Sequence, residues 1–379
     1  MLRRKRMRDA KRPFRPVLTG AVLTVLFLVL TLVMIPDPET GGTLAERLYN
    51  NFLLMLDRDE RLASFSVDTY PDSRFAFHRG GVAVAGQTGF SLHNSSGSRV
   101  YTRSGMFQEL NLQTAGPYLL AFDRDGTALT LLHGTREVYA GDWDEPIQTA
   151  KAGERGHLLV LSRNKLSLLS PRQVLLYAYH MPRSEPIDAA ASPGGDRIAL
   201  AAVAQDGMVL AASVLILDPA KVDPVATVPL GDTVPLAVVN APGGGFLILT
   251  EDAAWHIGRD GAILSTYRYE GRHLIAFARF GDRGFLLSFN HSAASRIETG
   301  LLTPDGRYAP LLLSDEDILG LQAAGDRFLV RYPGRSEVYD AQGRQLGRYF
   351  ETEGARAVHL DGDGSLLAVF ATTAVRIEG

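Results

Sequence analysis

The chain has 379 residues, of which 46% are hydrophobic and 21% charged, which is the composition of a folded protein with length for a large core. Its net charge of −3 conceals eight basic residues among the first sixteen. The remainder is therefore acidic, which disfavours nucleic-acid binding because a binding face needs clustered cations. The absence of cysteine excludes disulfides, thiolate zinc sites and thiol catalysis.

The first predicted element is a transmembrane signal anchor over residues 17–35, VLTGAVLTVLFLVLTLVMI. This stretch has no charge, and a helix of this length spans roughly 28 Å, close to the hydrocarbon thickness of a bilayer. A buried helix and a cleaved signal peptide are the alternatives. The following IPDPETGG contains prolines and acids instead of a small-residue cleavage site, so we expect the segment to remain as an anchor.

The basic tail, residues 1–16, predicts the orientation of that anchor. Lys and Arg concentrate on the cytoplasmic side of membrane helices, so the tail faces the cytoplasm and residues 36–379 lie outside. We therefore expect a single-pass protein of the cell membrane with an extracytoplasmic C-terminal domain. The membrane is its first predicted partner, and no nucleic acid is expected.

Residues 36–61 form the predicted juxtamembrane stalk. Thr43 and Glu46 have the spacing of a capping box, and apolar residues then recur at helical intervals at Leu44, Leu48, Phe52 and Met55 or Leu56. The pattern predicts a short amphipathic helix over residues 44–57. Its apolar stripe packs on the domain that follows or, in the alternative, lies in the outer lipid interface.

From residue 62 to residue 379 the pattern changes to short apolar strands separated by Gly, Pro, Asn and Asp. Strand–turn–strand units recur, with their turns at Gly97, Gly134, Pro171, Pro219, Gly261, Gly306 and Gly343. The steps between these turns are 37, 37, 48, 42, 45 and 37 residues. Another strand pair precedes each unit, and four strands in about 40 residues is the period of a propeller blade. The sequence therefore predicts an all-β fold, a β-propeller of four-stranded blades.

The two ends of this domain predict how the propeller closes. The last unit supplies three strands and then the chain ends, whereas residues 62–67 form a strand that has no blade of its own. Propellers commonly share one blade between the termini, because an open ring exposes sheet edges. We expect residues 62–67 to pair beside residues 374–377. Seven complete units and one shared blade give eight blades, with seven as the alternative.

This layout resembles bacterial membrane-anchored proteins whose outer part is a propeller of the WD-repeat or quinoprotein-like superfamily, in particular a group in anaerobic Gram-positive bacteria. Segments such as AAASPGGDRIALA, residues 189–201, are similar to the Ser-Pro-Asp-Gly blade openings of that superfamily. The resemblance carries no catalytic motif. The quinoprotein signature tryptophans are missing, since Trp143 and Trp255 are the only two, so no quinone or other cofactor is expected.

Residues 123–126 and 361–364 bring aspartates close together, as calcium loops do, but neither has the full ligand run. Both fall where a hairpin turn is required, and we interpret them as turns. Histidines lie in or beside predicted strands without metal-ligand spacing, at His78, His93, His133, His256, His291 and His359. No metal site is expected.

Carboxylates crowd residues 137–145, around Trp143, and residues 314–317. A glycosidase needs two carboxylates facing each other across a sugar, and a tryptophan can stack on one. Both runs also fit polar connections between blades. The preferred hypothesis is a non-catalytic binding or scaffolding module for a protein partner or envelope polymer. The alternative is an enzyme acting on envelope glycans through a carboxylate pair at the channel mouth.

Overall fold

The computed structural model describes residues 63–182, 184–206, 209–291 and 296–379. The predicted tail (1–16), membrane anchor (17–35) and stalk (36–61) lie outside the described residues. Within the described ranges, no helix is long and apolar enough to cross a membrane.

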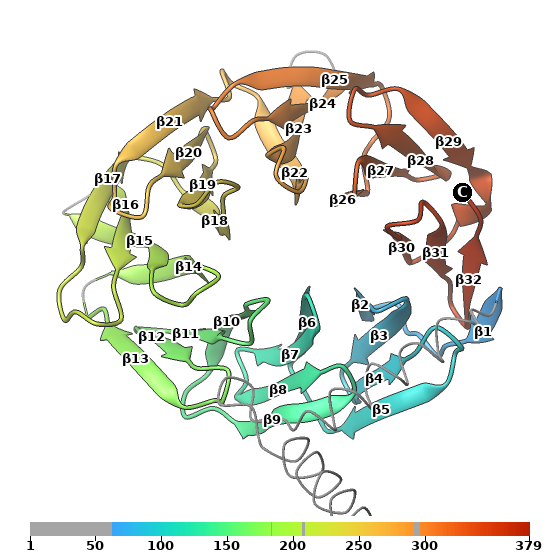
Figure 1. Cartoon of the computed structure of the whole chain (residues 1–379), viewed down its shortest axis with the longest axis horizontal. Helices are drawn as coiled ribbons and strands as arrows, with labels where there is room; N and C mark the ends of the chain where they lie inside the picture. The colour runs from blue at the N-terminus through green and yellow to red at the C-terminus, as the bar shows by residue number, and fades with distance from the viewer. Residues whose placement is uncertain (1–62, 183, 207–208, 292–295) are drawn as a thin grey trace, which may run out of the picture. The chain divides into compact units, whose positions relative to one another are not determined.

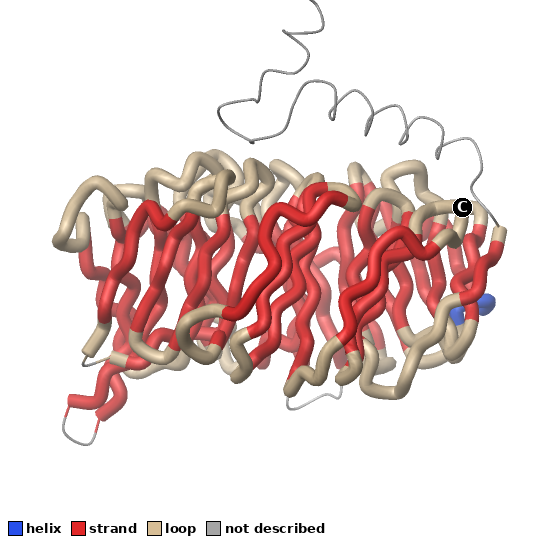
Figure 2. The backbone as a smooth tube through the Cα atoms, turned by 90° about the horizontal axis from the view of Figure 1, so that it is seen from below, coloured by secondary structure: helices blue, strands red, loops and turns tan. Residues whose placement is uncertain are grey.

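The described residues form antiparallel strands and one 3-10 turn, η1 (Phe350–Thr352), as the predicted all-β fold requires. Each unit is a four-stranded meander whose first strand lies nearest a central axis and whose fourth lies at the rim (Figure 1). We call this arrangement of sheets the sheet ring. The strands run between two faces at which the loops gather (Figure 2).

The inner strands are β2 (Arg74–His78), β6 (Glu109–Ala115), β10 (Ile147–Ala152), β14 (Glu185–Ala191), β18 (Pro235–Asn240), β22 (His273–Arg279), β26 (Gly320–Ala324) and β30 (Ala357–Leu360). The second strands are β3 (Gly81–Gly86), β7 (Tyr118–Arg124), β11 (Leu158–Ser162), β15 (Ile198–Asp206), β19 (Phe246–Thr250), β23 (Phe285–His291), β27 (Arg327–Tyr332) and β31 (Leu366–Val369).

The third strands are β4 (Gly89–His93), β8 (Ala128–His133), β12 (Lys165–Leu169), β16 (Val209–Leu217), β20 (Ala253–Ile257), β24 (Arg296–Leu302), β28 (Arg335–Asp340) and β32 (Thr373–Ile377). The outer strands are β5 (Arg99–Ser104), β9 (Arg136–Asp142), β13 (Leu175–His180), β17 (Ala226–Gly231), β21 (Ile263–Arg268), β25 (Tyr308–Ser314), β29 (Gln345–Tyr349) and β1 (Ser64–Ser66).

These strands make six four-stranded sheets and one eight-stranded sheet in the described part of the chain. The larger sheet consists of two meanders, β6–β9 and β10–β13, which are linked by a single parallel bridge between Ile147 and Arg124. The longest predicted step, from Pro171 to Pro219, has a local cause: β15 and β16 are nine residues each, longer than the other strands described.

The core lies between neighbouring sheets, because each sheet packs on both of its faces. The second strands are accordingly mostly apolar, as in LLVLS of β11 and FLILT of β19, in which every residue is buried. Outer strands instead alternate exposed and half-buried residues, as β5, β13 and β21 do.

Residues from both ends of the domain meet in the terminal sheet. β1 pairs antiparallel with β32, and Ser64 lies opposite Val375, where the sequence predicted a pairing of residues 62–67 with residues 374–377. Phe65 is 8% exposed and packs with Leu367 of this sheet and with Val82 of the β2–β5 sheet. The terminal sheet is therefore continuous with its neighbour through a buried apolar cluster.

The regularly spaced turn glycines have an inter-sheet reason. Gly97, Gly261 and Gly306 have positive φ, and a Cβ built on each would lie 2.2 to 2.4 Å from a Cβ of the preceding sheet, at Phe65, Ala226 and Ser265. Only glycine allows this backbone conformation and this close approach together. At these three positions the repeated turn glycine thus marks a close contact between successive sheets.

Candidate binding site in the central channel

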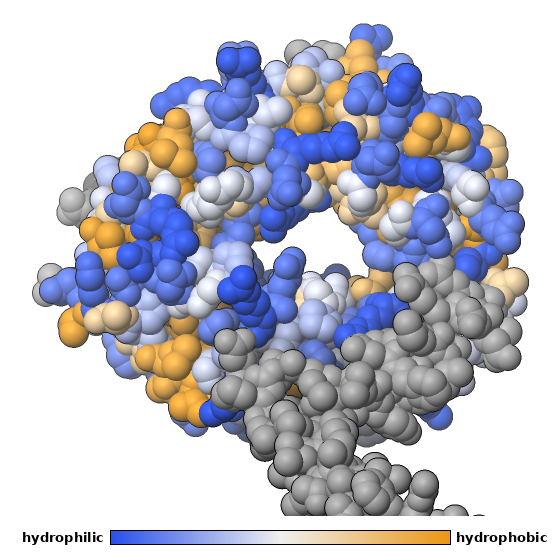
Figure 3. All heavy atoms as spheres, viewed as in Figure 1, coloured by the Kyte–Doolittle hydropathy of each residue, from blue (hydrophilic) through white to orange (hydrophobic). Residues whose placement is uncertain are grey.

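An open passage runs through the middle of the sheet ring, and hydrophilic residues cover much of its rim (Figure 3). A hollow of about 400 Å³ lies in its wall, between the four inner strands β26, β30, β2 and β6. Its lining combines the aromatic rings of Phe75 and Phe77 with Gln113, Gln322 and His359. This mixture of apolar walls and a few polar groups is typical of a ligand-binding hollow.

His359 is held in a fixed orientation on β30. Its ring stacks on Phe77 of the neighbouring sheet, with centroids 4.6 Å apart and planes inclined by 9°. Gln322 Nε2 donates a hydrogen bond to His359 Nδ1 at 2.7 Å, so the ring proton lies on Nε2, which faces Asp361 Oδ1 at 3.5 Å. Both ring nitrogens thus have protein partners.

The charge state of His359 follows from this setting. Burial lowers the pKa of His359, the Asp361 carboxylate opposes that effect, and the Arg376 guanidinium reinforces it. Asp361 also pairs with Arg376, whose Nη1 lies 2.6 Å from Asp361 Oδ2. The imidazole is therefore neutral at neutral pH, and its carboxylate partner is already engaged by a cation.

Two amides and an arginine complete the wall. Gln322 Oε1 accepts the backbone N–H of Leu360 at 3.0 Å, which joins β26 to β30. Arg331 donates to the carbonyls of Ala355 and Arg356, at 2.9 Å for the latter, and so fixes the connection that leads into β30. Gln113 Oε1 differs, because it is buried and has no hydrogen-bond partner among the described residues.

Another part of the channel wall is sealed. Asp188 Oδ2 accepts from Lys151 Nζ at 2.6 Å and from the backbone N–H of Val238 at 2.7 Å. Lys151 Nζ also donates to the Val238 carbonyl at 2.9 Å. These bonds join β10, β14 and β18, and the charges of Lys151 and Asp188 neutralise each other. This part of the channel wall therefore holds the three strands together.

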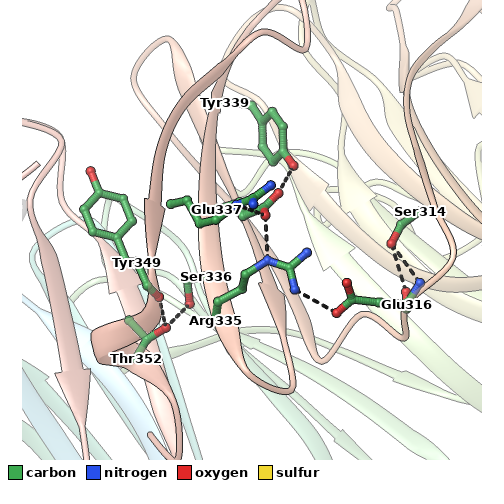
Figure 4. A network of polar contacts seen from close by, with 9 residues as sticks. Ser314, Glu316, Arg335, Ser336, Glu337, Tyr339, Tyr349 and Thr352 are labelled. Carbon is green, nitrogen blue, oxygen red and sulfur yellow. Dashed lines mark hydrogen bonds and ion pairs between the residues drawn. The ribbon is translucent and has the colours of Figure 1, made fainter.

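A charged network lies on the sheet of β26–β29 (Figure 4). Glu337, 3% exposed, accepts from Arg335 Nε at 2.6 Å and from Arg348 Nε at 2.8 Å, and Tyr339 donates to its other oxygen. Arg335 Nη1 also reaches Glu316 at 2.8 Å. Burial alone would raise the pKa of Glu337, but the Tyr339 hydroxyl and the Arg335 guanidinium hold it below its usual value. This carboxylate is ionised, so it cannot serve as a general acid.

The two acidic runs of the sequence are not brought together. Glu137 lies on the outer strand β9 and accepts from the Tyr101 hydroxyl at 2.7 Å, and Trp143 packs against the core of its own sheet. The second run connects β25 to β26, where Asp315 pairs with Arg296 at 2.9 Å and Glu316 with Arg335. The second run agrees with its interpretation as a polar connection between sheets. The first run differs, because residues 137–142 lie within β9, and the connection that follows leads to β10 of the same eight-stranded sheet.

The aspartate loops are hairpin turns in the structure. Asp123 Oδ1 accepts the backbone N–H groups of Gln108 and Glu109 at 2.8 Å each, which ties the connection before β6 to the end of β7. Asp363 accepts from Ser365 at 2.7 Å. In both loops these carboxylate oxygens face protein donors.

The six histidines lie on different strands. His78 ends β2, His93 ends β4, His133 ends β8, His256 lies on β20 and His359 on β30, while the side chain of His291 lies outside the description. Several sit between sheets: His93 stacks at 6.4 Å on Phe65, and His256 Nδ1 lies 2.9 Å from the Pro304 carbonyl. His93 and His256 therefore pack between neighbouring sheets.

Sequence reasoning did not identify the hollow in the channel. Glutamines and arginines carry no motif, and Gln113 comes from a different repeat unit from Gln322 and Arg331. The signal that could have located them is the repeat itself, because each inner strand follows a polar connection and must border the axis.

No family model matches this sequence, and no curated protein is significantly similar to it. Solved structures do match. The Chaetomium thermophilum Sqt1 structure, bound to the N-terminus of ribosomal protein L10, is 12% identical with a TM-score of 0.57, covering 83% of this chain and 99% of that one. The C-terminal WD40 domain of Sif2 is 11% identical with a TM-score of 0.57, covering 84% and 95%.

BamB from Moraxella catarrhalis is 13% identical with a TM-score of 0.53, covering 84% of this chain and 99% of that one. At such low identities the likeness establishes the fold and nothing more. The chain is a β-propeller similar in fold to the WD40 and BamB propellers.

Proposed function

We propose that this chain is a non-catalytic binding module that holds a protein partner. The observation that carries the proposal is the state of its chemical groups: the carboxylates of Glu337, Asp188 and Asp361 are all neutralised by neighbouring cations. A glycosidase needs a carboxylic acid and a carboxylate free to face a sugar, and the two acidic runs lie on separate sheets. The shared fold with the WD40 propellers, of which Sqt1 is bound to a ribosomal-protein terminus, supports a peptide or protein as partner.

The proposed binding site is the hollow between β26, β30, β2 and β6. Its volume of about 400 Å³ suits one or two side chains of a partner, with Phe75 and Phe77 as apolar walls. An envelope polymer is the other candidate ligand, and the test below separates the two.

The proposal includes an eight-bladed ring closed by a shared blade. The pairing of β1 with β32 and the division of the eight-stranded sheet into two meanders support it. It also includes a single membrane anchor at residues 17–35 with the propeller outside the cell, supported by the uncharged segment and the basic tail.

Capture with the tagged full chain in detergent tests the function. Wild type is compared with Thr114→Arg, which places a large cation at an exposed position of the hollow, and with the control Thr227→Arg on the outer strand β17. We expect a specific envelope protein to be retained by wild type and control, and retention to fall about tenfold for Thr114→Arg. Release of new reducing ends from cell-wall fragments by the purified chain, or retention of glycan alone, would contradict the proposal.

Labelling of a single cysteine tests the location. The chain has no cysteine, so Met106→Cys, at a side chain 85% exposed, supplies one reactive site. We expect a membrane-impermeant maleimide to label intact cells that carry Met106→Cys and to spare those that carry Arg8→Cys in the tail. The opposite labelling would reverse the proposed topology.

A further inference from the structure

The outer strand β13 is an unprotected sheet edge. Natural sheets guard their edges with charges, prolines or very short strands. Among the described outer strands of five or more residues, all but one carry a charge or a proline: β5, β9, β21 and β29 have arginine, and β17 and β25 have proline. The exception is β13, LLYAYH, which pairs with β12 on one side only.

A groove of about 450 Å³ runs along this edge. One wall is formed by residues 177–180 of β13, and the other by residues 219–222, which follow β16 in the next sheet. Tyr177 and Tyr179 stack along the groove, with ring centroids 6.4 Å apart. The groove therefore lies beside β13, between this strand and the next sheet, and has a wall of two stacked aromatic rings.

The surface around the groove is apolar. Val174, Leu175 and Leu176 are 60%, 54% and 49% exposed, and Val222 across the groove is 87% exposed. Figure 3 shows hydrophobic atoms gathered at the rim where Figure 1 places β13. Such a cluster of exposed large side chains is typical of an interaction surface.

The charge of the groove indicates which kind of segment would bind there. Lys221 is its only charged lining residue in the described part of the chain, and no carboxylate lines it. Of the carboxylates near the groove, Asp218 is paired with Arg197 at 3.0 Å, and Asp223 acts on Tyr179 without lining the groove. An occupant with a carboxylate is favoured, and a second copy of β13 is disfavoured because its sequence has no acidic residue.

We propose that β13 accepts an extended segment of a partner protein as an additional strand, with apolar side chains and at least one carboxylate near Lys221. Main-chain hydrogen bonds from the free edge would supply affinity, and the tyrosine wall and Lys221 would supply selectivity. The inference rests on the proposed function and names a second surface for the same class of partner.

Fluorescence anisotropy tests the proposal on the full chain in detergent micelles. The probe is a labelled peptide of about eight residues that alternates valine and glutamate. We expect saturable binding that weakens about tenfold in Leu176→Lys, which adds the missing edge charge. The matched control is Leu264→Lys on β21, an outer strand with the same burial pattern, and it should leave binding unchanged. Equal melting temperatures of the two variants show that both are folded.

Two further peptides distinguish strand pairing from non-specific binding. A probe N-methylated at every residue has no N–H to donate from either edge, and we expect it not to bind. A probe with lysine in place of glutamate should bind wild type weakly, and Lys221→Glu should reverse that preference.

Three results would overturn the proposal. They are absence of saturable binding up to about 1 mM by a cooperatively folded chain, equal binding of the N-methylated probe, and a dimer that Leu176→Lys abolishes. The last would assign the edge to a second copy. If envelope capture survives in Leu176→Lys while peptide binding is absent, this inference alone fails; if wild type captures no envelope protein, the proposed function fails.

Discussion

Two pairs of third and outer strands, β28–β29 and β32–β1, are stabilised by different interactions. β28 and β29 are joined by a hairpin, and Glu337 faces Arg348 across the two strands at 2.8 Å. β32 and β1 come from opposite ends of the domain and pair over only three residues. In place of an ion pair, the closing pair has Phe65, buried against Leu367 and Val82.

The difference follows from chain connectivity. A hairpin keeps its two strands close even in the unfolded chain, so its pairing needs little further stabilisation. Strands from the two ends must first be brought together, and burial of an aromatic side chain supplies more free energy than a partly exposed ion pair. We therefore expect the closing pair to fail first when its apolar contact is removed.

The largest expected effect is that of Phe65→Ala. Loss of this buried ring should lower the free energy of unfolding by about 3–5 kcal/mol, measured by denaturant unfolding of the detergent-solubilised chain. Phe350→Ala, at a side chain 60% exposed, is the control and should cost well under about 1 kcal/mol. Equal costs would show that the terminal pairing does not hold the ring.

The next effect is acid destabilisation near the closing sheet. Burial, with the charges of Arg79 and His133, lowers the pKa of His78 from 6.5 to about 4. The unfolded state then binds more protons below pH 6.5, so stability is complete above that pH and is lost as pH falls toward 4. His78 contributes about 3 kcal/mol of this loss.

Unfolding curves between pH 7.5 and pH 4, the range set by that pKa shift, measure the effect. His78→Leu, which cannot titrate, should lose less stability over this range than wild type. Burial also lowers the pKa values of His93 and His359, so a residual acid dependence should persist in the variant. Identical pH profiles for the two chains would contradict the assignment to His78.

Glu337→Gln tests the ion pairs that stabilise the β28–β29 pair. The substitution leaves Arg335 and Arg348 without their shared carboxylate, and we expect a loss of about 2 kcal/mol because both guanidinium groups retain access to water. The cost should remain below that of Phe65→Ala. A larger cost would mean that the ionic network contributes more to the free energy of unfolding than burial of Phe65 does.

The smallest expected effect concerns the turn glycines. Gly306 and Gly325 both have positive φ, so alanine strains the backbone at each. Only at Gly306 does the new Cβ meet the preceding sheet, 2.4 Å from the Ser265 Cβ, whereas nothing lies within 4 Å of Gly325. Gly306→Ala should therefore cost about 1 kcal/mol more than Gly325→Ala in thermal unfolding. Equal costs would remove the inter-sheet role of the repeated glycine.

The sequence predicted the strands of the propeller because these depend on local signals, and it predicted the pairing of the two ends because one strand was left without a partner. Turn glycines such as Gly261 and Gly343 mark hairpins whose strands are neighbours along the chain. Residues 62–67 were identified because a strand without partners must pair with the one open edge. The alternative of a carboxylate pair at the channel mouth rested on composition alone, and the structure places Glu137 on an outer strand.

The hollow and the rim groove were not predicted, because each joins residues of different sheets. Gln322 meets His359 only when two successive sheets have docked, and Tyr179 faces residues 219–222 for the same reason. One sequence feature of the groove was visible, however: LLYAYH is an outer strand without a charge or a proline. Its meaning required knowing which strands lie at the rim.

By itself, then, the sequence determined the order of strands and the period of the repeat, since hydrophobic alternation and glycine turns act over a few residues. It predicted the meeting of the two ends from a strand left without a partner. The docking of sheets decided which polar side chains became partners, as for Glu316 with Arg335, and which surfaces stayed open. Those outcomes depend on packing between residues distant in the chain, where one sheet sets the environment of the next.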